Sequence, residues 1–249
     1  MACSRFGTMT CDLAILGGGG GIGRALTLRA KAEGWTVTVM DLQASLSAHP
    51  VPLGVSSVAI DVTDPSSVSA AFSTLEPLDG FVNLAGFMSP HKTLANTPLE
   101  EFDEVMTGNL RGAFLAAQAA LPLLQQASGA MVNVASGLGA HARPGFGPYA
   151  AAKAGMISLT KTLALEAAPH VRVNAVGPSA VDTAFLRGGE GRDTNDAVPV
   201  DLKAMAAATP LGRIATPDDV VGPILFLLGK DASFMTGQVL WINGGGYMP

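Results

Sequence analysis

Two side chains that could exchange a proton with a substrate stand one helical turn apart in this sequence. Tyr149 and Lys153 occur in the run Tyr-Ala-Ala-Ala-Lys, and Ser136 lies thirteen residues before the tyrosine, after an apolar segment. Residues four apart share one face of a helix, so the ammonium can lie beside the phenol. A free tyrosine has a pKa of about 10, and a neighbouring positive charge is expected to lower it toward neutrality. The trio therefore predicts general acid–base chemistry, although a surface lysine beside a half-buried tyrosine would have the same spacing.

The composition argues against a nucleic-acid or membrane partner. The chain has 249 residues, of which 48% are hydrophobic and 14% charged, and its net charge is −5. No run of either sign forms a basic nucleic-acid footprint or a polybasic membrane patch. The longest apolar stretches, around Gly112–Leu124 and Val220–Leu228, contain proline or polar residues and are too short to span a bilayer.

The first ten residues do not have the pattern of a secretory signal peptide. Met1–Thr10 lacks a basic start followed by a long apolar core, so we interpret residues 1–10 as a flexible N-terminal extension. Cys3 and Cys11 are the only cysteines and make no disulfide framework. The four histidines lack metal-ligand spacing, so we predict no metal site, although His91 and His141 could touch a substrate. These features predict a reduced, cytoplasmic protein.

Short β-rich runs alternate with helical patterns along the chain, which predicts a parallel sheet with crossover helices. The expected strands are Leu13–Leu16, Thr36–Met40, Ser57–Ile60, Gly80–Val82, Ala130–Val134, Val171–Ala175 and Gln238–Ile242. The expected helices are Ile22–Glu33, Pro65–Leu75, Leu99–Gly108, Leu110–Gln126, Tyr149–Ala167 and Pro217–Leu228. Because the strands are almost wholly apolar, helices should cover both faces of the sheet. We therefore predict an α/β fold, a Rossmann-like doubly wound parallel sheet of about seven strands, in a single domain over residues 11–249.

Two segments fit this alternation poorly. Asp41–Ser57 holds two prolines and no convincing helical period, so the second crossover should be short or irregular. Thr183–Thr209 is polar and glycine-rich in its first half and helical only later. A long segment of that kind within a compact domain is usually a lid or a binding loop. We therefore expect a substrate lid at about residues 183–209.

The strongest signal near the start is the glycine run Gly17–Gly23, which follows an expected strand and opens an expected helix. Glycine allows a tight turn and lets a pyrophosphate approach the amides at a helix N-terminus, where the dipole favours anions. Two registers fit the run, G-x-G-x-x-G through Gly18, Gly20 and Gly23, and G-x-x-x-G-x-G through Gly17, Gly21 and Gly23. A nucleotide-hydrolase phosphate loop is excluded, because Arg24 stands where that motif needs lysine. The run therefore predicts a dinucleotide site.

Asp41 indicates which dinucleotide is bound. It ends the second expected strand, where a carboxylate can accept hydrogen bonds from both hydroxyls of an adenosine ribose and would repel a 2′-phosphate. No arginine or lysine follows closely to accommodate that phosphate. We therefore predict NAD as the cofactor, with NADP less favoured. The alternative for Asp41 is an ordinary turn residue after a strand.

Taken together, these motifs resemble the short-chain dehydrogenase/reductase family of the compact type, over about Cys11–Gly245. The matching segments are Gly17-x-x-x-Gly21-x-Gly23, Asp61-Val62, Asn83-Leu-Ala-Gly86, the set Asn109, Ser136, Tyr149 and Lys153, and Pro178-Ser-Ala-Val-Asp-Thr183. The resemblance implies cofactor contacts from Gly17, Gly20, Gly21, Ile22, Gly23, Asp41, Leu42, Asp61, Val62, Asn83, Ala85, Gly86, Tyr149, Lys153, Pro178, Val181 and Thr183. Four support positions depart from the family pattern, which puts local hydrogen bonds in doubt: Leu16, Leu84, Ser179 and Asn243.

The resemblance also implies a role for each of four catalytic residues. Tyr149 would be the acid in carbonyl reduction and the base in alcohol oxidation, while Lys153 would hold the phenolate and the nicotinamide ribose. Ser136 would donate to the substrate oxygen as the hydride moves. Asn109 would kink its helix and hold a proton-relay water, although its position alone suits a helix cap.

The resulting hypothesis is an NAD-dependent oxidoreductase that interconverts a secondary alcohol and a ketone. Two alternatives stay open, a 3-oxoacyl thioester reductase that uses NADPH and a non-catalytic NAD-binding redox sensor. The thioester alternative rests on Pro210–Arg213 and Thr236–Gln238, which resemble that group.

The helical segments also bear on assembly. Leu110–Gln126 and Tyr149–Ala167 are apolar around most of their circumference, more than one sheet face can cover. We therefore expect a two-fold contact between these helices of two subunits. The resemblance implies a second interface near Val239–Ile242 and hence a homotetramer.

Overall fold

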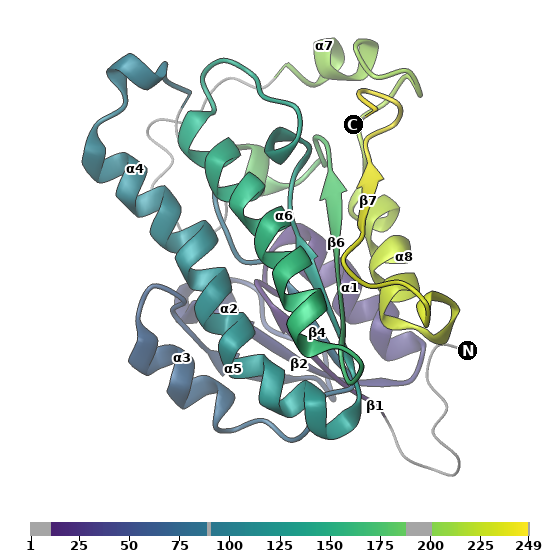
Figure 1. Ribbon diagram of the computed structural model, residues 1–249. Helices are drawn as coiled ribbons and strands as arrows, with labels where there is room; N and C mark the ends of the chain where they lie inside the picture. The colour runs from purple at the N-terminus through teal and green to yellow at the C-terminus, as the bar shows by residue number, and fades with distance from the viewer. Residues whose placement is uncertain (1–10, 89–90, 188–200, 249) are drawn as a thin grey trace.

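The computed structural model describes residues 11–88, 91–187 and 201–248, and it places seven parallel strands in one sheet within this part of the chain (Figure 1). They are β1 (Cys11–Leu16), β2 (Trp35–Asp41), β3 (Ser56–Ala59), β4 (Gly80–Asn83), β5 (Ala130–Val134), β6 (Arg172–Pro178) and β7 (Val239–Ile242). Their order is β3-β2-β1-β4-β5-β6-β7, and neighbouring strands are parallel. The predicted Rossmann-like doubly wound sheet is therefore confirmed. Because the order reverses between β1 and β4, a crevice is expected beyond the carboxyl ends of these strands.

Helices cover both faces of the sheet, as the apolar strands predicted. The helices are α1 (Gly21–Ala32), α2 (Gln43–Ala48), α3 (Pro65–Phe72), α4 (Leu99–Met106), α5 (Gly112–Ala127), α6 (Gly147–Ala167), α7 (Leu202–Ala207) and α8 (Pro217–Leu228). Alternate residues of β1 point to opposite faces. Leu13 and Ile15 pack in the core beneath α1 and α8, whereas Ala14 and Leu16 pack in the core beneath α3, α5 and α6. Figure 1 shows α5 and α6 side by side on the near face of the sheet.

Two details of the connections differ from the sequence-based expectation. The crossover after β2 is short, which the expectation of a short or irregular crossover allowed, but it contains a helix, α2, that the sequence pattern did not indicate. Helices α4 and α5 are joined without a break by a π-helical turn over Thr107–Arg111. Such turns often occur at functional sites. The later part of the expected lid is helical, as predicted, and forms α7.

Cys11 corrects one expectation, because it is disulfide-bonded instead of free. Two cysteines argue against a framework of several disulfides, but they do not exclude a single bridge. The expected N-terminal extension, residues 1–10, lies outside the described residues, as does the central part of the expected lid, residues 188–200. Among the helices that are described, none has the length and apolar character needed to cross a membrane.

Candidate active site

A cavity of about 640 Å³ lies beyond the carboxyl ends of the central strands. Its walls come from the segments that follow β1, β4, β5 and β6, so it occupies the crevice created by the reversal in strand order. The predicted site residues that line it are Gly17, Gly20, Gly21, Ile22, Gly23, Asp41, Leu42, Asp61, Val62, Ala85, Gly86, Ser136, Tyr149, Lys153, Pro178, Val181 and Thr183. Asn83 and Asn109 are also buried nearby but do not line the cavity.

The glycine run turns the chain from β1 into α1 and leaves no room for a side chain at Gly17, Gly21 or Gly23. Gly17 has a φ of +76°, and a Cβ there would lie 2.8 Å from the backbone of Leu84. A Cβ at Gly21 would lie 2.6 Å from Thr183, and one at Gly23 would lie 2.5 Å from Gly18. These contacts account for the register Gly17-x-x-x-Gly21-x-Gly23. Helix α1 also begins without a side-chain cap, so its first amides can bind an anion such as a pyrophosphate.

The carboxylate of Asp41 is held in a fixed position at one end of the cavity. Its Oδ2 accepts a hydrogen bond from the Gly19 amide at 2.8 Å, and its Oδ1 accepts one from the Leu42 amide at 2.8 Å. Two residues that the sequence analysis did not identify lie next to this end of the cavity. Ser45 of α2 is buried and lines the cavity. Arg24 donates from Nη1 to the Gly19 carbonyl at 2.7 Å, so a cation does lie near Asp41 although none follows it in sequence.

Two buried asparagines hold the loop after β4 that forms the cavity wall. Asn83 accepts a hydrogen bond from the Ala85 amide at 3.1 Å. Asn109, in the π-helical turn, donates to the carbonyls of Phe87 and Val105 at 3.0 Å and accepts from the Phe87 amide at 3.2 Å. Its side-chain amide is thus hydrogen-bonded to the backbone of two segments, the loop after β4 and helix α4. The asparagine joins the π-helical turn to the cavity wall, a more specific arrangement than a helix cap.

Ser136, Tyr149 and Lys153 meet at the floor of the cavity. Ser136 follows β5, while the other two lie one turn apart in α6 and are each only 3% exposed. The Ser136 side chain interacts with the phenol of Tyr149 and favours its ionised form, which lowers the pKa of the phenol. The Nζ of Lys153 lies 5.5 Å from the centroid of the tyrosine ring and donates to the Val134 carbonyl at 2.9 Å. The sequence spacing therefore brought together a proton donor, a hydroxyl and a cation, as predicted.

The direction of the tyrosine pKa shift corrects the sequence-based expectation. Burial raises the pKa of Tyr149 above its ordinary value, and the hydrogen bond from Ser136 offsets only part of this rise. Burial also lowers the pKa of Lys153, to about 8. Desolvation disfavours both charged forms, and the sequence spacing could not show how deeply the pair is buried. In this state Tyr149 keeps its proton at neutral pH and can donate it.

Apolar side chains that the sequence analysis did not name individually also line the cavity, and two of them lie within the expected lid at about residues 183–209. Phe87, Phe185 and Leu186 line the cavity, and the Phe185 ring lies 6.0 Å from that of Tyr149. Phe87 lies in the loop after β4, whereas Phe185 and Leu186 lie in a 3-10 helix of four residues, Ala184–Arg187, which is too short to show a period. His91 packs edge-on against Phe146, whereas His141 stacks on another aromatic ring, and neither lines the cavity.

Comparisons with known proteins agree with this geometry. A family model described as enoyl-(acyl carrier protein) reductase matches residues 18–247. The 4-formylbenzenesulfonate dehydrogenase TsaC1/TsaC2 of Comamonas testosteroni is 37% identical over 243 residues, which are 93% of this chain and 95% of that protein. The 3-oxoacyl-[acyl-carrier-protein] reductase FabG of Staphylococcus aureus strain Mu50 is 35% identical over 96% of this chain and 99% of its own length.

Solved structures give the same result. An oxidoreductase of the short-chain dehydrogenase/reductase family from Burkholderia thailandensis superimposes with a TM-score of 0.84 at 33% identity, covering 96% of this chain and 93% of that one. The chain belongs to the short-chain dehydrogenase/reductase family. A further solved structure, ElxO with NADP bound, has a TM-score of 0.84 at 28% identity and covers 96% of this chain and 99% of its own.

As a short-chain dehydrogenase/reductase, the protein is an oxidoreductase that acts on CH–OH groups of a small molecule with NAD(P). The cavity fits that cofactor, because the glycine run keeps side chains away from the uncapped start of α1 and the carboxylate of Asp41 lines the cavity at the end of β2. When bound, NAD(P) supplies or accepts the hydride.

Proposed function

We propose that this short-chain dehydrogenase/reductase interconverts a secondary alcohol and a ketone, and that Tyr149 gives or takes the proton. The observation that carries the proposal is the meeting of Ser136, Tyr149 and Lys153 at the floor of the cavity. In reduction, Tyr149 donates its proton to the carbonyl oxygen, which Ser136 also contacts. The resulting phenolate is stabilised by the hydroxyl of Ser136 and by the ammonium of Lys153. In oxidation the same groups act in reverse.

The test is turnover of a panel of secondary alcohols and cyclic diols with NAD, followed at the nicotinamide absorbance. The matching ketones are tested with NADH. Reaction with at least one alcohol–ketone pair is expected, and its loss in Ser136→Ala would tie the reaction to this cavity. A wild-type protein that binds NADH but turns over no member of the panel would contradict the proposal for this substrate class.

For the cofactor, we propose NAD over NADP, and the support is the fixed carboxylate of Asp41. Asp41→Ala combined with Leu42→Arg is expected to raise the ratio of kcat/KM for NADP over NAD by roughly 10- to 100-fold, because a repulsive charge is replaced by an attractive one. Both cofactors are compared at equal substrate concentration. Leu53→Arg adds the same charge at an exposed leucine and serves as the control. Better use of NADPH than of NADH by the wild type would contradict this assignment, and Arg24 would then be the first residue to replace.

Reduction of a 3-oxoacyl thioester with NADPH is the second candidate, favoured by the similarity to FabG. The segments that suggested it serve the fold in this structure. Arg213 pairs with Asp219 at the start of α8, with 2.6 Å between Nη1 and Oδ2. The Thr236 hydroxyl accepts from the Val173 amide at 3.1 Å. Acetoacetyl-CoA with NADPH, assayed beside the alcohol panel, separates the two candidates.

We also propose that residues 11–249 act as one catalytic unit in which about 183–209 cover the substrate. The support is the placement of Phe185 and Leu186 in the cavity wall, beside Tyr149. An apolar cover of this kind favours a substrate with an uncharged, apolar flank next to its carbonyl group.

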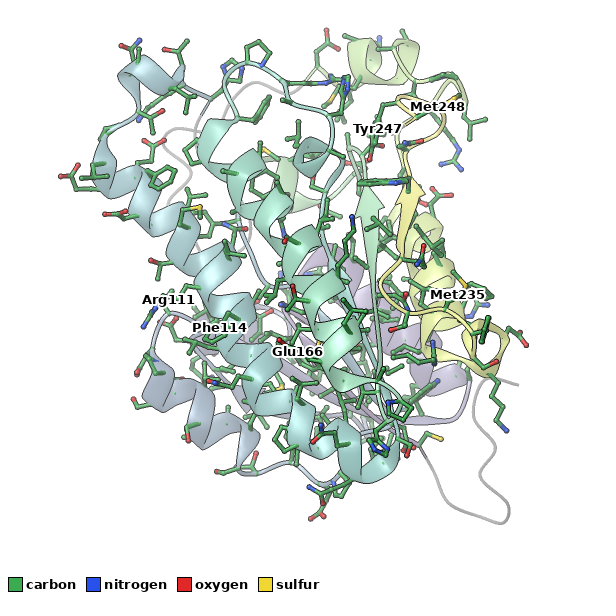
Figure 2. The ribbon with its side chains drawn as sticks, viewed as in Figure 1. Arg111, Phe114, Glu166, Met235, Tyr247 and Met248 are labelled. Carbon is green, nitrogen blue, oxygen red and sulfur yellow. The ribbon has the colours of Figure 1, made fainter. Side chains whose placement is uncertain are left out.

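For assembly, we propose a homotetramer in which α5 and α6 of two subunits pack together. Figure 2 shows Phe114 of α5 and Glu166 of α6 on the face turned to the viewer. On these helices Phe114 is 48% exposed and Leu165 is 81% exposed. The second contact would use β7, which forms one edge of the sheet.

Light scattering tests the assembly. The wild type is expected at about four times the chain mass of 25.3 kDa. Leu165→Glu should produce a smaller species, because it places a charge within an apolar contact. Leu53→Glu, on a loop beside the other face of the sheet, should not change the mass. A fully active wild-type monomer would contradict the proposal.

A further inference from the structure

The segment that follows β7 turns back toward the site, and Tyr247 in it lies close to Gly137. After β7, Gly244 and Gly245 adopt φ values of +58° and +86°, a region that glycine enters at little cost. The buried Asn243 accepts from the Gly245 amide at 3.0 Å and donates to the Tyr247 carbonyl at 2.7 Å. Figure 2 shows Tyr247 and Met248 beyond β7, at the upper end of the C-terminal segment. The asparagine thus fixes where the Tyr247 side chain is placed.

Tyr247 fills the space between two segments that lead into the site. A Cβ at Gly137, the residue after Ser136, would lie 2.6 Å from the Tyr247 hydroxyl, so the ring lies against this backbone. The same hydroxyl donates to the Gly177 carbonyl of β6 at 3.4 Å. His141 stacks on the ring at 5.6 Å between centroids, and Trp241 meets it edge-on at 5.4 Å.

The segment after Ser136 depends on such contacts for a fixed position. It forms a single 3-10 turn over Gly137–Gly139, which contains two glycines and gains little rigidity from its own sequence. Ser136 accepts a hydrogen bond from the Leu138 amide at 3.2 Å within this turn. Gly139 lies against the Lys153 backbone on one side. Tyr247 packs against the same turn through Gly137.

We propose that Tyr247 is a positioning residue that holds the turn after Ser136, and thereby keeps the Ser136 hydroxyl on the Tyr149 phenol. Tyr247 does not line the cavity, so it acts through Ser136 and not on the reacting atoms. The inference rests on the proposed roles of Ser136 and Tyr149.

The experiment compares Tyr247→Ala with Tyr247→Phe, and Met248→Ala serves as a control on the neighbouring side chain, which is 89% exposed. In Tyr247→Ala, kcat is expected to fall roughly 10-fold or more, because small misplacement of a reacting group is costly. The KM for NADH should stay unchanged. Tyr247→Phe keeps the ring and should restore most of kcat. In a Ser136→Ala background, Tyr247→Ala should have little further effect, since both changes remove the same interaction.

A second readout does not depend on turnover. The chain has two tyrosines, so each Tyr247 variant leaves Tyr149 as the only phenol. Its ionisation can then be followed by phenolate absorbance. Without the bond from Ser136, the pKa of Tyr149 should be higher in Tyr247→Ala than in Tyr247→Phe. Where the alanine variant does not fold, Tyr247→Leu replaces it, because leucine retains apolar volume but not the ring.

The outcomes separate this inference from the proposed function. Absence of wild-type turnover would count against the proposed function, while the titration would still report on Tyr247. Equal pKa values of Tyr149 in the alanine and phenylalanine variants would overturn the role of Tyr247. An undiminished effect of Tyr247→Ala in the Ser136→Ala background would overturn it as well.

Discussion

Tyr149→Phe is expected to lower turnover by a factor of roughly 10² or more, because it removes the group that transfers the proton. The substitution keeps the ring, which is buried and lies near Phe185. NADH should therefore still bind. Turnover is measured with the best alcohol–ketone pair of the panel, and NADH binding is measured by its fluorescence. Retention of most of the activity would mean that another group handles the proton.

Because the pKa of Tyr149 is raised, the two directions of the reaction should depend differently on pH. A phenol that keeps its proton supports carbonyl reduction at neutral pH, whereas alcohol oxidation needs the phenolate and should become faster as pH rises. Ser136→Ala should move the oxidation profile to still higher pH, because the hydroxyl that favours the phenolate is gone.

The features that could be predicted from the sequence either follow a regular pattern along the chain or need particular residue types. All seven strands were expected from short β-rich runs, and central strands such as β4 and β5 are wholly buried because helices cover both faces of the sheet. Ser136, Tyr149 and Lys153 were expected to meet because one helical turn and one strand end fix their distances. The glycine run was expected at the cavity because only glycine tolerates its close backbone approaches.

The parts that could not be predicted depend on contacts between distant segments. Ser45 lies in a helix of six residues, too short to show a period. Arg24 donates to the carbonyl of Gly19, and the amide of Gly19 donates to Asp41. This shared partner brings Arg24 close to Asp41, which is seventeen positions later in the sequence. Tyr247 meets Gly137 across more than one hundred residues. The pKa of Tyr149 follows burial, which is a property of the assembled fold and not of the Tyr149–Lys153 spacing.

Lys153→Met is expected to abolish most turnover and yet to stabilise the fold at neutral pH. Lys153 is 3% exposed, and burial lowers its pKa from 10.5 to about 8. A shift of this size corresponds to a cost of about 3 kcal/mol for carrying the charge in the folded state at pH 7. Methionine removes that cost but leaves the Val134 carbonyl without its donor, which costs about 1–3 kcal/mol. The net gain should be small at pH 7, a rise in Tm of a few degrees at most.

The pH dependence of this gain is the sharper test. Between the folded pKa of about 8 and the unfolded pKa of 10.5, the unfolded chain holds more protons than the folded one, so wild-type stability rises with pH through this window. Below pH 8 the folded state bears the full cost of the buried Lys153 charge, and above pH 10.5 this cost is gone. The advantage of Lys153→Met should therefore shrink by about 2–3 kcal/mol between pH 7 and pH 10, measured by urea unfolding at each pH. Lys161→Met, at an exposed lysine of the same helix, should show no such change. The prediction would be contradicted if Lys153→Met and the wild type differed in stability by the same amount at both pH values. That result would mean that other groups in the fold stabilise the ammonium beside Tyr149 as well as water does.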